Sequence, residues 1–281
     1  MRRVAHIADV HFGAATAEAV QALEAALDVI APDIVVVSGD LTQHGRRSEF
    51  RDAAAFVERL PGIVVAVPGN HDVPREIAPR FVSPLGRYDR SIGPVATDRF
   101  ADNEVAIIGI NSARAWGLHW NWAHGRVGHA DIAEARVWLA ARPSGVFGGL
   151  VVHHPPVLFE PRRGFHELGR GRHLLRMLGA VGAEAVMSGH LHATGWRMID
   201  GVLHMQAGTS ASHRVRGEAN AFLILEVHED RLELESWLVG EEGEFARGRQ
   251  ERIVRPGIHS PDARSVVEAD VGRFPRQGDG R

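Results

Sequence analysis

Short apolar runs alternate with segments of helical periodicity along the first 190 residues, and this alternation is the strongest constraint on the fold. Residues 34–38 form a β-branched run, which is typical of a strand covered on both faces. Residues 17–31 repeat apolar side chains at the spacing of one helical face. The pattern predicts further strands and helices at 4–9, 48–60, 63–67, 105–110, 131–141, 148–152, 174–181 and 185–187. This β-α-β order predicts an α/β fold with a largely parallel sheet.

The last part of the regular pattern reads differently. Residues 202–206, 221–227 and 232–238 alternate like antiparallel strands, so a second, antiparallel or mixed sheet is expected to pack on the first. Residues 74–103 carry several prolines and are expected to form a long loop.

The chain turns polar and rich in Arg, Gly and Pro from about residue 241. Its last residues, 273–281, have the composition of a loosely held tail. We therefore expect one folded domain over residues 1–240 and a polar C-terminal extension over residues 241–281.

Composition limits the chemistry that the chain can perform. The 281 residues contain no cysteine, which excludes disulfides, thiolate metal sites and cysteine nucleophiles. All 32 basic residues are arginine, so Schiff-base chemistry and a P-loop lysine are excluded as well. A net charge of −3 does not indicate a broad duplex-DNA footprint. No apolar run has the length of a membrane span, and the N-terminus enters a strand-like segment rather than a signal peptide. We expect a cytoplasmic protein with no membrane insertion and no stable nucleic-acid partner.

Polar side chains of the metal-ligand type follow five of the expected strands, at the point where each strand ends. Because the carboxyl ends of parallel strands share one edge of a sheet, we expect these side chains to meet. Residues i and i+2 of an extended chain point the same way, so Asp9 and His11 can hold one ion. The candidate residues are Asp9, His11, Asp40, Asn70, His71, Asp72, His153, His154, His190 and His192.

Each of these motifs alone has an ordinary structural explanation. Asp9-x-His11 can be a turn or a cap, and Gly39-Asp40 is a common turn. Their joint occurrence, in order and at five strand ends, is what predicts a metal site. Nitrogen and oxygen ligands without sulfur suit divalent ions such as Mn, Fe, Zn, Co or Ni.

The chain resembles the calcineurin-like metallophosphoesterase superfamily over residues 4 to about 238, which makes the domain expected over residues 1–240 a catalytic domain. The resemblance rests on five motifs in order, namely Asp9-x-His11, Gly39-Asp40, Gly69-Asn70-His71-Asp72, His153 with the following prolines, and Gly189-His190-Leu191-His192. It implies a four-layer α/β/β/α sandwich of two mixed sheets flanked by helices, with two divalent metal ions.

The resemblance also implies a ligand set for each ion. The first ion would be bound by Asp9, His11, Asp40 and His192. The second would be bound by Asp40, Asn70, His153 and His190, with Asp40 as the bridge. Of the adjacent pair, His153 fits the His-x-Pro pattern of the family better than His154.

The activity implied is hydrolysis of a phosphoric ester, in which a metal-bridging hydroxide attacks phosphorus in line. His71 would be the acid near the leaving group, a task that an imidazole with a pKa of about 6.5 suits. Its alternative role is a hydrogen bond to a neighbouring ligand. Asp72 would orient His71 or a ligand, or else cap the following loop.

The layout is most similar to class III cyclic-nucleotide phosphodiesterases and related glycerophosphodiesterases. The similarity rests on residues 38–42, 68–72 and 153–156. We therefore expect a small phosphodiester substrate. The alternatives are a phosphomonoester, a nucleotide-sugar or lipid pyrophosphate, a DNA end, or a scaffold without catalysis. Relatives with this layout are often oligomers, so the resemblance leaves a homo-oligomer open.

Two segments could contact the substrate. Residues 112–129 gather tryptophan and histidine, which could stack on a base or simply pack on one another. Residues 162–176 gather five arginines, which could receive an anionic substrate or form a solvated basic surface.

Overall fold

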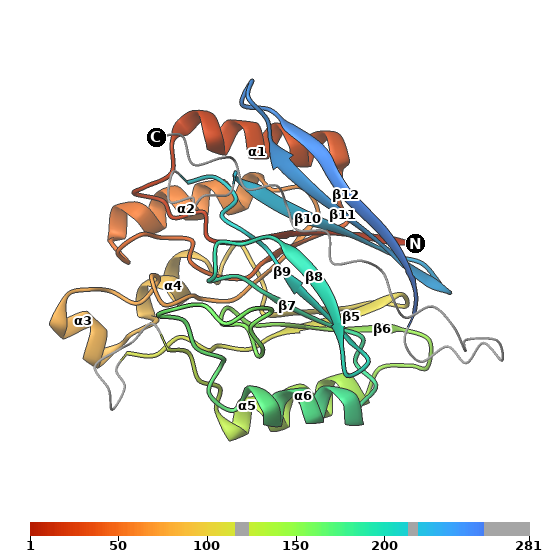
Figure 1. The fold of residues 1–281 in the computed structure, drawn as a ribbon. Helices are drawn as coiled ribbons and strands as arrows, with labels where there is room; N and C mark the ends of the chain where they lie inside the picture. The colour runs from red at the N-terminus through yellow and green to blue at the C-terminus, as the bar shows by residue number, and fades with distance from the viewer. Residues whose placement is uncertain (116–123, 213–218, 256–281) are drawn as a thin grey trace.

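A computed structural model describes residues 1–115, 124–212 and 219–255, and these residues form two sheets with helices on both outer sides (Figure 1). The first sheet has the strand order β12 (Phe245–Val254), β11 (Arg231–Val239), β10 (Ala221–Val227), β1 (Arg2–Ile7), β2 (Ile34–Val37) and β3 (Ile63–Ala66). The second has the order β4 (Arg99–Ala101), β5 (Val105–Gly109), β6 (Phe147–Val151), β7 (Ala185–Ser188), β9 (Val202–Gln206) and β8 (Gly195–Ile199). Both sheets are mixed, because β1, β2 and β3 are parallel in one and β5, β6, β7 and β9 are parallel in the other.

Helices cover the outer face of each sheet. Figure 1 shows α1 (Ala17–Ile30) and α2 (Arg47–Arg59) over the first sheet, and α5 (His129–Ala140) and α6 (Gly171–Ala180) over the second. Two short helices, α3 (Ile77–Val82) and α4 (Gly86–Ser91), lie between β3 and β4. The predicted four-layer α/β/β/α sandwich is confirmed.

Three cores separate the four layers, and the β-branched run of β2 contributes to two of them. Val35 and Val37 pack toward α1 and α2, whereas Ile34 and Val36 face the second sheet. The third core joins the second sheet to α5 and α6. A strand buried on both faces needs apolar side chains at every position, which is why this segment is continuously apolar.

Residues 202–206, which were expected to be antiparallel, pair with one strand in each sense. These residues form β9, which pairs in parallel with β7 in the second sheet and not with β10. β9 also pairs antiparallel with β8 through a tight turn at Asp200 and Gly201, whose φ angles are 50° and 77°. Two positive φ angles are typical of the type I′ hairpin turn. The alternating pattern indicated a strand correctly, but it carries no information about the partner.

Regular structure is present in the expected loop and in the expected C-terminal extension. Residues 74–103 include α3, α4 and β4 in place of a continuous loop. Residues 245–254 of the expected extension form β12, which pairs with β11 at the edge of the first sheet. The tail expected over residues 273–281 lies outside the described residues. Within the described part of the chain, none of the helices combines the length and apolar character needed to cross a membrane.

Candidate metal centre

The strand ends of both sheets bring the predicted ligands to one place. Asp9 and His11 follow β1, Asp40 follows β2, and Asn70 follows β3, all in the first sheet. The second sheet contributes one histidine after β6 and two after β7. All seven predicted ligands are buried, namely Asp9, His11, Asp40, Asn70, His153, His190 and His192.

One group joins the first strand to the loop after β7. The Nε2 atom of His192 lies 3.2 Å from Oδ1 of Asp9 and 3.3 Å from Nε2 of His11. The Nε2 atom of His11 lies 3.7 Å from the same Asp9 oxygen. Three ligand atoms from two sheets therefore converge on one point.

Asp40 stands between this group and a second one. Its Oδ2 atom lies 3.3 Å from Nε2 of His153 and 4.0 Å from Nε2 of His11. The same His153 nitrogen is 3.2 Å from Oδ1 of Asn70. The other Asp40 oxygen accepts a hydrogen bond of 2.8 Å from the backbone N–H of His71. One carboxylate oxygen thus faces histidines of both groups, while the other is held by the backbone.

His190 completes the second group and also lies close to a histidine outside the predicted ligand set. Its ring centre lies 5.1 Å from that of His153 and 4.5 Å from that of His154. His154 is buried, and its Nδ1 atom is 2.7 Å from Oγ of Ser112. The sequence motif favoured His153 alone, but both adjacent histidines lie at the centre. The doubled histidine after an apolar strand was the signal available for this second residue.

The backbone is bent sharply at most of the predicted ligands. Five of the seven have positive φ, with values of 53° at Asp9, 55° at His11, 55° at Asp40, 72° at His190 and 55° at His192. This left-handed region is uncommon for residues other than glycine, and such conformations cluster at functional sites.

Glycines make room where the ligand loops touch. A Cβ atom at Gly69 would lie 2.1 Å from Oδ1 of Asp40, and one at Gly39 would lie 2.7 Å from Nδ1 of His153. Both contacts are too short for any other residue. The glycines before Asp40 and Asn70 are therefore required by close packing of the two loops.

Burial and mutual charge set the protonation of the ligands. Burial lowers the pKa of His11 to about 4, and burial, together with the positive charge of His153, lowers the pKa of His190 to about 3. Both imidazoles are therefore neutral at pH 7, as metal ligands must be. Burial opposes ionisation of Asp40, but the neighbouring His153 holds the pKa of that carboxyl well below its usual value. Burial disfavours the charged form of His153 too, yet Asp40 raises its pKa to about 9.

His71 and Asp72 have different surroundings. The Nδ1 atom of His71 donates a hydrogen bond of 2.8 Å to the carbonyl of Gln43, and its ring packs edge-on against His11 with centres 4.9 Å apart. Asp72 is fully buried and accepts four hydrogen bonds, from the backbone of Leu41, Thr42 and Gly69 and from the Thr42 hydroxyl. Asp72 therefore ties the loop after β3 to the loop after β2. Burial, together with the charge of Asp40, raises the pKa of Asp72 to about 7.

The residues present fit a pair of divalent ions. Oδ1 of Asp9 is buried and accepts no hydrogen bond among the described residues, although two histidine nitrogens lie near it. The Nε2 atoms of His11 and His192 also face one another, and two imidazole nitrogens in that arrangement suit a shared cation. Carboxylate, amide and imidazole groups around one shared carboxylate are a ligand set for two such ions.

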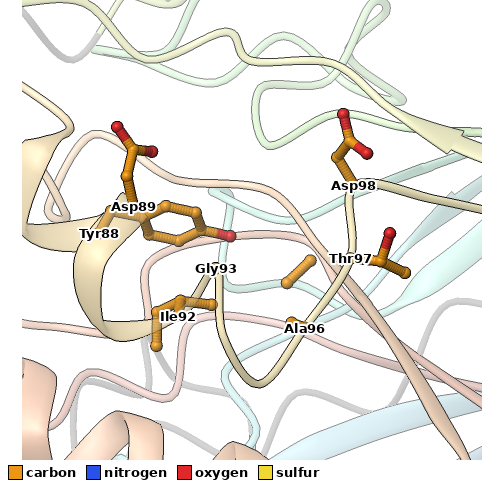
Figure 2. A pocket seen from close by; sticks show the side chains of 8 residues that line it. Tyr88, Asp89, Ile92, Gly93, Ala96, Thr97 and Asp98 are labelled. Carbon is orange, nitrogen blue, oxygen red and sulfur yellow. The ribbon is translucent and has the colours of Figure 1, made fainter.

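Two other features of the described residues are separate from this centre. A hollow of about 350 Å³ lies beside α4, and Figure 2 shows Tyr88 and Asp89 on one side of it and Thr97 and Asp98 on the other. None of the predicted ligands lines it. The half-exposed group Glu226, His228 and Glu233 lies on the first sheet, and arginines already pair with both of its carboxylates.

Comparison with known proteins gives one family and several related folds. A family model described as calcineurin-like phosphoesterase matches residues 2–194. No curated protein matches the chain significantly. A dimetal phosphatase from Danio rerio is 16% identical, with a TM-score of 0.64 and coverage of 90% of this chain and 98% of that chain.

Two other solved structures share the architecture. A purple acid phosphatase from yellow lupin (Lupinus luteus) seeds is 15% identical, with a TM-score of 0.64 and coverage of 91% of this chain and 54% of that chain. Vacuolar protein sorting 29 from Cryptosporidium parvum is 12% identical, with a TM-score of 0.50 and coverage of 90% and 98%. At these identities the likeness shows the fold.

Proposed function

This chain belongs to the calcineurin-like phosphoesterase family of metal-dependent phosphoester hydrolases, and from that premise we propose that it hydrolyses a small phosphodiester at a two-ion centre. In this proposal Asp40 is shared by both ions. The first ion is also held by Asp9, His11 and His192, and the second by Asn70, His153 and His190.

The observation that carries the proposal is the position of Asp40. One of its oxygens faces His11 and His153, which come from different sheets and different ligand groups. The low pKa of Asp40 keeps the carboxylate charged, as a bridging ligand must be.

The chemistry would be divided between the ions and the chain. When bound, two divalent ions lower the pKa of water and neutralise charge on phosphoryl oxygens. His71 is the residue that we expect to protonate the leaving alcohol, because its ring is oriented by the Gln43 carbonyl and lies beside His11. The hydrogen bonds of Asp72 hold together the loops that carry Asp40 and Asn70. We therefore assign Asp72 a positioning role.

The preference for a diester is supported by the motifs around the ligands. Residues 38–42, 68–72 and 153–156 are similar to those of class III cyclic-nucleotide phosphodiesterases and glycerophosphodiesterases. Phosphodiesters of this kind carry one negative charge on the scissile phosphate, whereas phosphomonoesters carry up to two. The two classes are therefore separable by a simple pair of substrates.

The test combines substrate preference with metal content. We expect the Mn-loaded protein to hydrolyse bis-p-nitrophenyl phosphate with a higher kcat/KM than p-nitrophenyl phosphate. The Asp40→Ala variant should lose most of both ions by elemental analysis and at least about 10³-fold in rate, since one ligand serves both ions. Asp89→Ala, which removes an exposed carboxylate of α4, should change neither quantity.

Three results would contradict parts of the proposal. Preference for the monoester would make the chain a phosphomonoesterase. Full ion content and full rate in Asp40→Ala would show that Asp40 does not bridge the two ions. A metal-supplemented protein that retains no divalent ion would exclude the two-ion mechanism itself.

A further inference from the structure

Two segments that are distant in sequence form one structure beside the metal centre. We call residues 124–128 and 155–170 the loop pair. The backbone N–H of Gly169 donates to the carbonyl of Gly125, and the N–H of Val127 donates to the carbonyl of Gly169. The rings of His124 and His166 are in contact, with centres 4.0 Å apart and planes inclined at 60°. The described parts of the two segments singled out in the sequence, 112–129 and 162–176, therefore meet; the tryptophans of the first segment lie outside the described residues.

The loop pair packs directly on the ligand histidines. A Cβ atom at Gly125 would lie 2.2 Å from the His154 ring, so the backbone of this loop rests on the imidazole. The ring of Phe165 meets the ring of His190 at a centre distance of 5.3 Å and an angle of 74°. The loop pair therefore forms a wall of the centre.

Arg162 is fixed to this wall by two contacts. Its Nη1 atom donates a hydrogen bond of 2.8 Å to the carbonyl of Leu191, the residue between His190 and His192. Its guanidinium carbon lies 5.4 Å from the ring centre of Phe165, which in turn packs on His190. The guanidinium is therefore held at the edge of the ligand loop.

The charge of Arg162 is not neutralised by the described part of the chain. No carboxylate among the described residues forms an ion pair with it, although Glu160 and Glu167 are on the same loop. A guanidinium has five N–H donors, and the Leu191 carbonyl takes one of them. Arg162 thus keeps donors and a full charge in a position beside the centre.

Charge counting indicates which anion this guanidinium would meet. Two divalent ions together with the carboxylates of Asp9 and Asp40 and the attacking hydroxide would leave a net charge of about +1, which balances the single negative charge of a phosphodiester. The scissile phosphate therefore needs no further cation. The Arg162 guanidinium, which the Phe165 ring separates from His190, is suited to a second anionic group on the same substrate.

We propose that Arg162 binds a second phosphate of the substrate, so that the preferred substrates are phosphodiesters whose alcohol carries another phosphate, as in a phosphorylated nucleotide. This inference rests on the proposed function. It assigns Arg162 to substrate specificity and leaves the chemical step to the centre.

The chain contains a closely matched control. Arg197 of β8 also donates one hydrogen bond of 2.8 Å to a carbonyl, that of Phe159, and also lies 5.4 Å from a phenylalanine ring centre. Its carbonyl partner is on the loop pair rather than between two ligands. Arg197→Gln therefore removes the same charge and the same kind of contacts without altering the ligand loop.

The test uses two substrates that differ only in the second phosphate, namely thymidine 5′-(p-nitrophenyl phosphate) and its 3′-phosphorylated derivative. In the Mn-loaded wild-type protein we expect kcat/KM to be higher for the phosphorylated compound. Arg162→Gln should lower that ratio about tenfold, through KM rather than kcat, with Arg162→Lys in between. Arg197→Gln should leave the ratio unchanged, and all variants should keep their ion content.

Binding is measured separately from turnover. Calorimetry with thymidine 3′,5′-bisphosphate and thymidine 5′-monophosphate should show a tighter Kd for the bisphosphate, and the difference should disappear in Arg162→Gln. If neither substrate is hydrolysed, the proposed phosphodiesterase function fails, while this binding difference still decides the role of Arg162. An equal loss of kcat/KM on both compounds in Arg162→Gln, or no preference in the wild-type protein, would overturn the inference. Arg162 would then only stabilise the loop at Leu191.

Discussion

The left-handed backbone at five of the seven predicted ligands has an energetic cost. For a residue with a Cβ atom this conformation costs about 1–2 kcal/mol. Packing of the surrounding strands must offset this cost, because short loops alone could not keep the backbone in this conformation. The types and order of the candidate ligands could be read from the sequence, because each follows an apolar strand. The bends could not be predicted, because aspartate and histidine are enriched in the left-handed region but still adopt other conformations at most positions.

His71 gives the prediction that bears most directly on mechanism. We expect His71→Asn to lower kcat about 10²–10³-fold for diesters with alkyl leaving groups, since these need a proton as they depart. The loss should be much smaller for p-nitrophenyl esters, whose leaving group is stable as an anion. Steady-state kinetics on both kinds of substrate, with metal analysis, measures this.

The control for His71 is a neighbouring histidine with a structural partner. His44 pairs with Glu49 at 3.2 Å and lies outside the ligand set. Its replacement by asparagine should leave the dependence on leaving group unaltered. An equal loss on both kinds of ester in His71→Asn would argue against the acid role.

At the scale of elements, strands were predicted more reliably than their partners. β1, β2, β3, β5, β6 and β7 were identified from apolar runs because both of their faces are buried. β8 and β12 were missed: both are edge strands, with Arg197 and Met198 exposed in β8 and most residues exposed in β12. Edge strands of this kind lack the apolar alternation on which sequence reasoning depends. Pairing of β9 with β7 is a long-range choice that no local pattern encodes.

β9 also carries a buried histidine with a consequence for acid stability. His204 is buried, and this burial lowers its pKa to about 4. The unfolded chain binds a proton at this histidine near pH 6.5, whereas the folded chain does so only near pH 4. Stability contributed by neutral His204 is therefore present above about pH 6.5 and is lost as the pH falls toward 4.

We expect His204→Gln to remove that part of the pH dependence. Urea unfolding at pH 7, 6 and 5, in chelator so that metal binding does not vary, should give a shallower fall in unfolding free energy for the variant. The difference between the two slopes can reach about 1.4 kcal/mol per pH unit. Parallel slopes would show that His204 does not titrate in this range.

At the scale of the molecule, a buried ion pair fastens the end of the described chain to the opposite sheet. Arg255, directly after β12, donates hydrogen bonds of 2.8 and 2.6 Å to the two carboxylate oxygens of Glu184, which precedes β7. Its Nη2 atom also reaches the carbonyl of Gly145 at 3.0 Å. Both side chains of the ion pair are about 95% buried. We propose that the folded domain extends through Arg255, beyond the boundary expected at residue 240.

Arg255→Ala should therefore be costly. It leaves the carboxylate of Glu184 buried without its partner, and we expect a loss of about 3–5 kcal/mol in unfolding free energy. Arg252→Ala removes a guanidinium from an exposed pair with Glu233 and should cost less than about 1 kcal/mol. Chemical denaturation of both variants tests this, and a similar small loss in both would place residue 255 outside the cooperative unit. Adding Glu184→Gln to Arg255→Ala should restore part of the loss.

The ligands of each predicted ion come from both sheets. Asp9, His11, Asp40 and Asn70 follow strands of the first sheet, whereas the three remaining histidines follow strands of the second. An ion in either position would therefore act as a cross-link between the two halves of the sandwich, in a chain that has no cysteine for a disulfide. Affinity for metal and docking of the sheets would then be linked quantities, each strengthening the other. Ion availability in the cell would set how firmly this molecule holds together, as well as how fast it turns over its substrate.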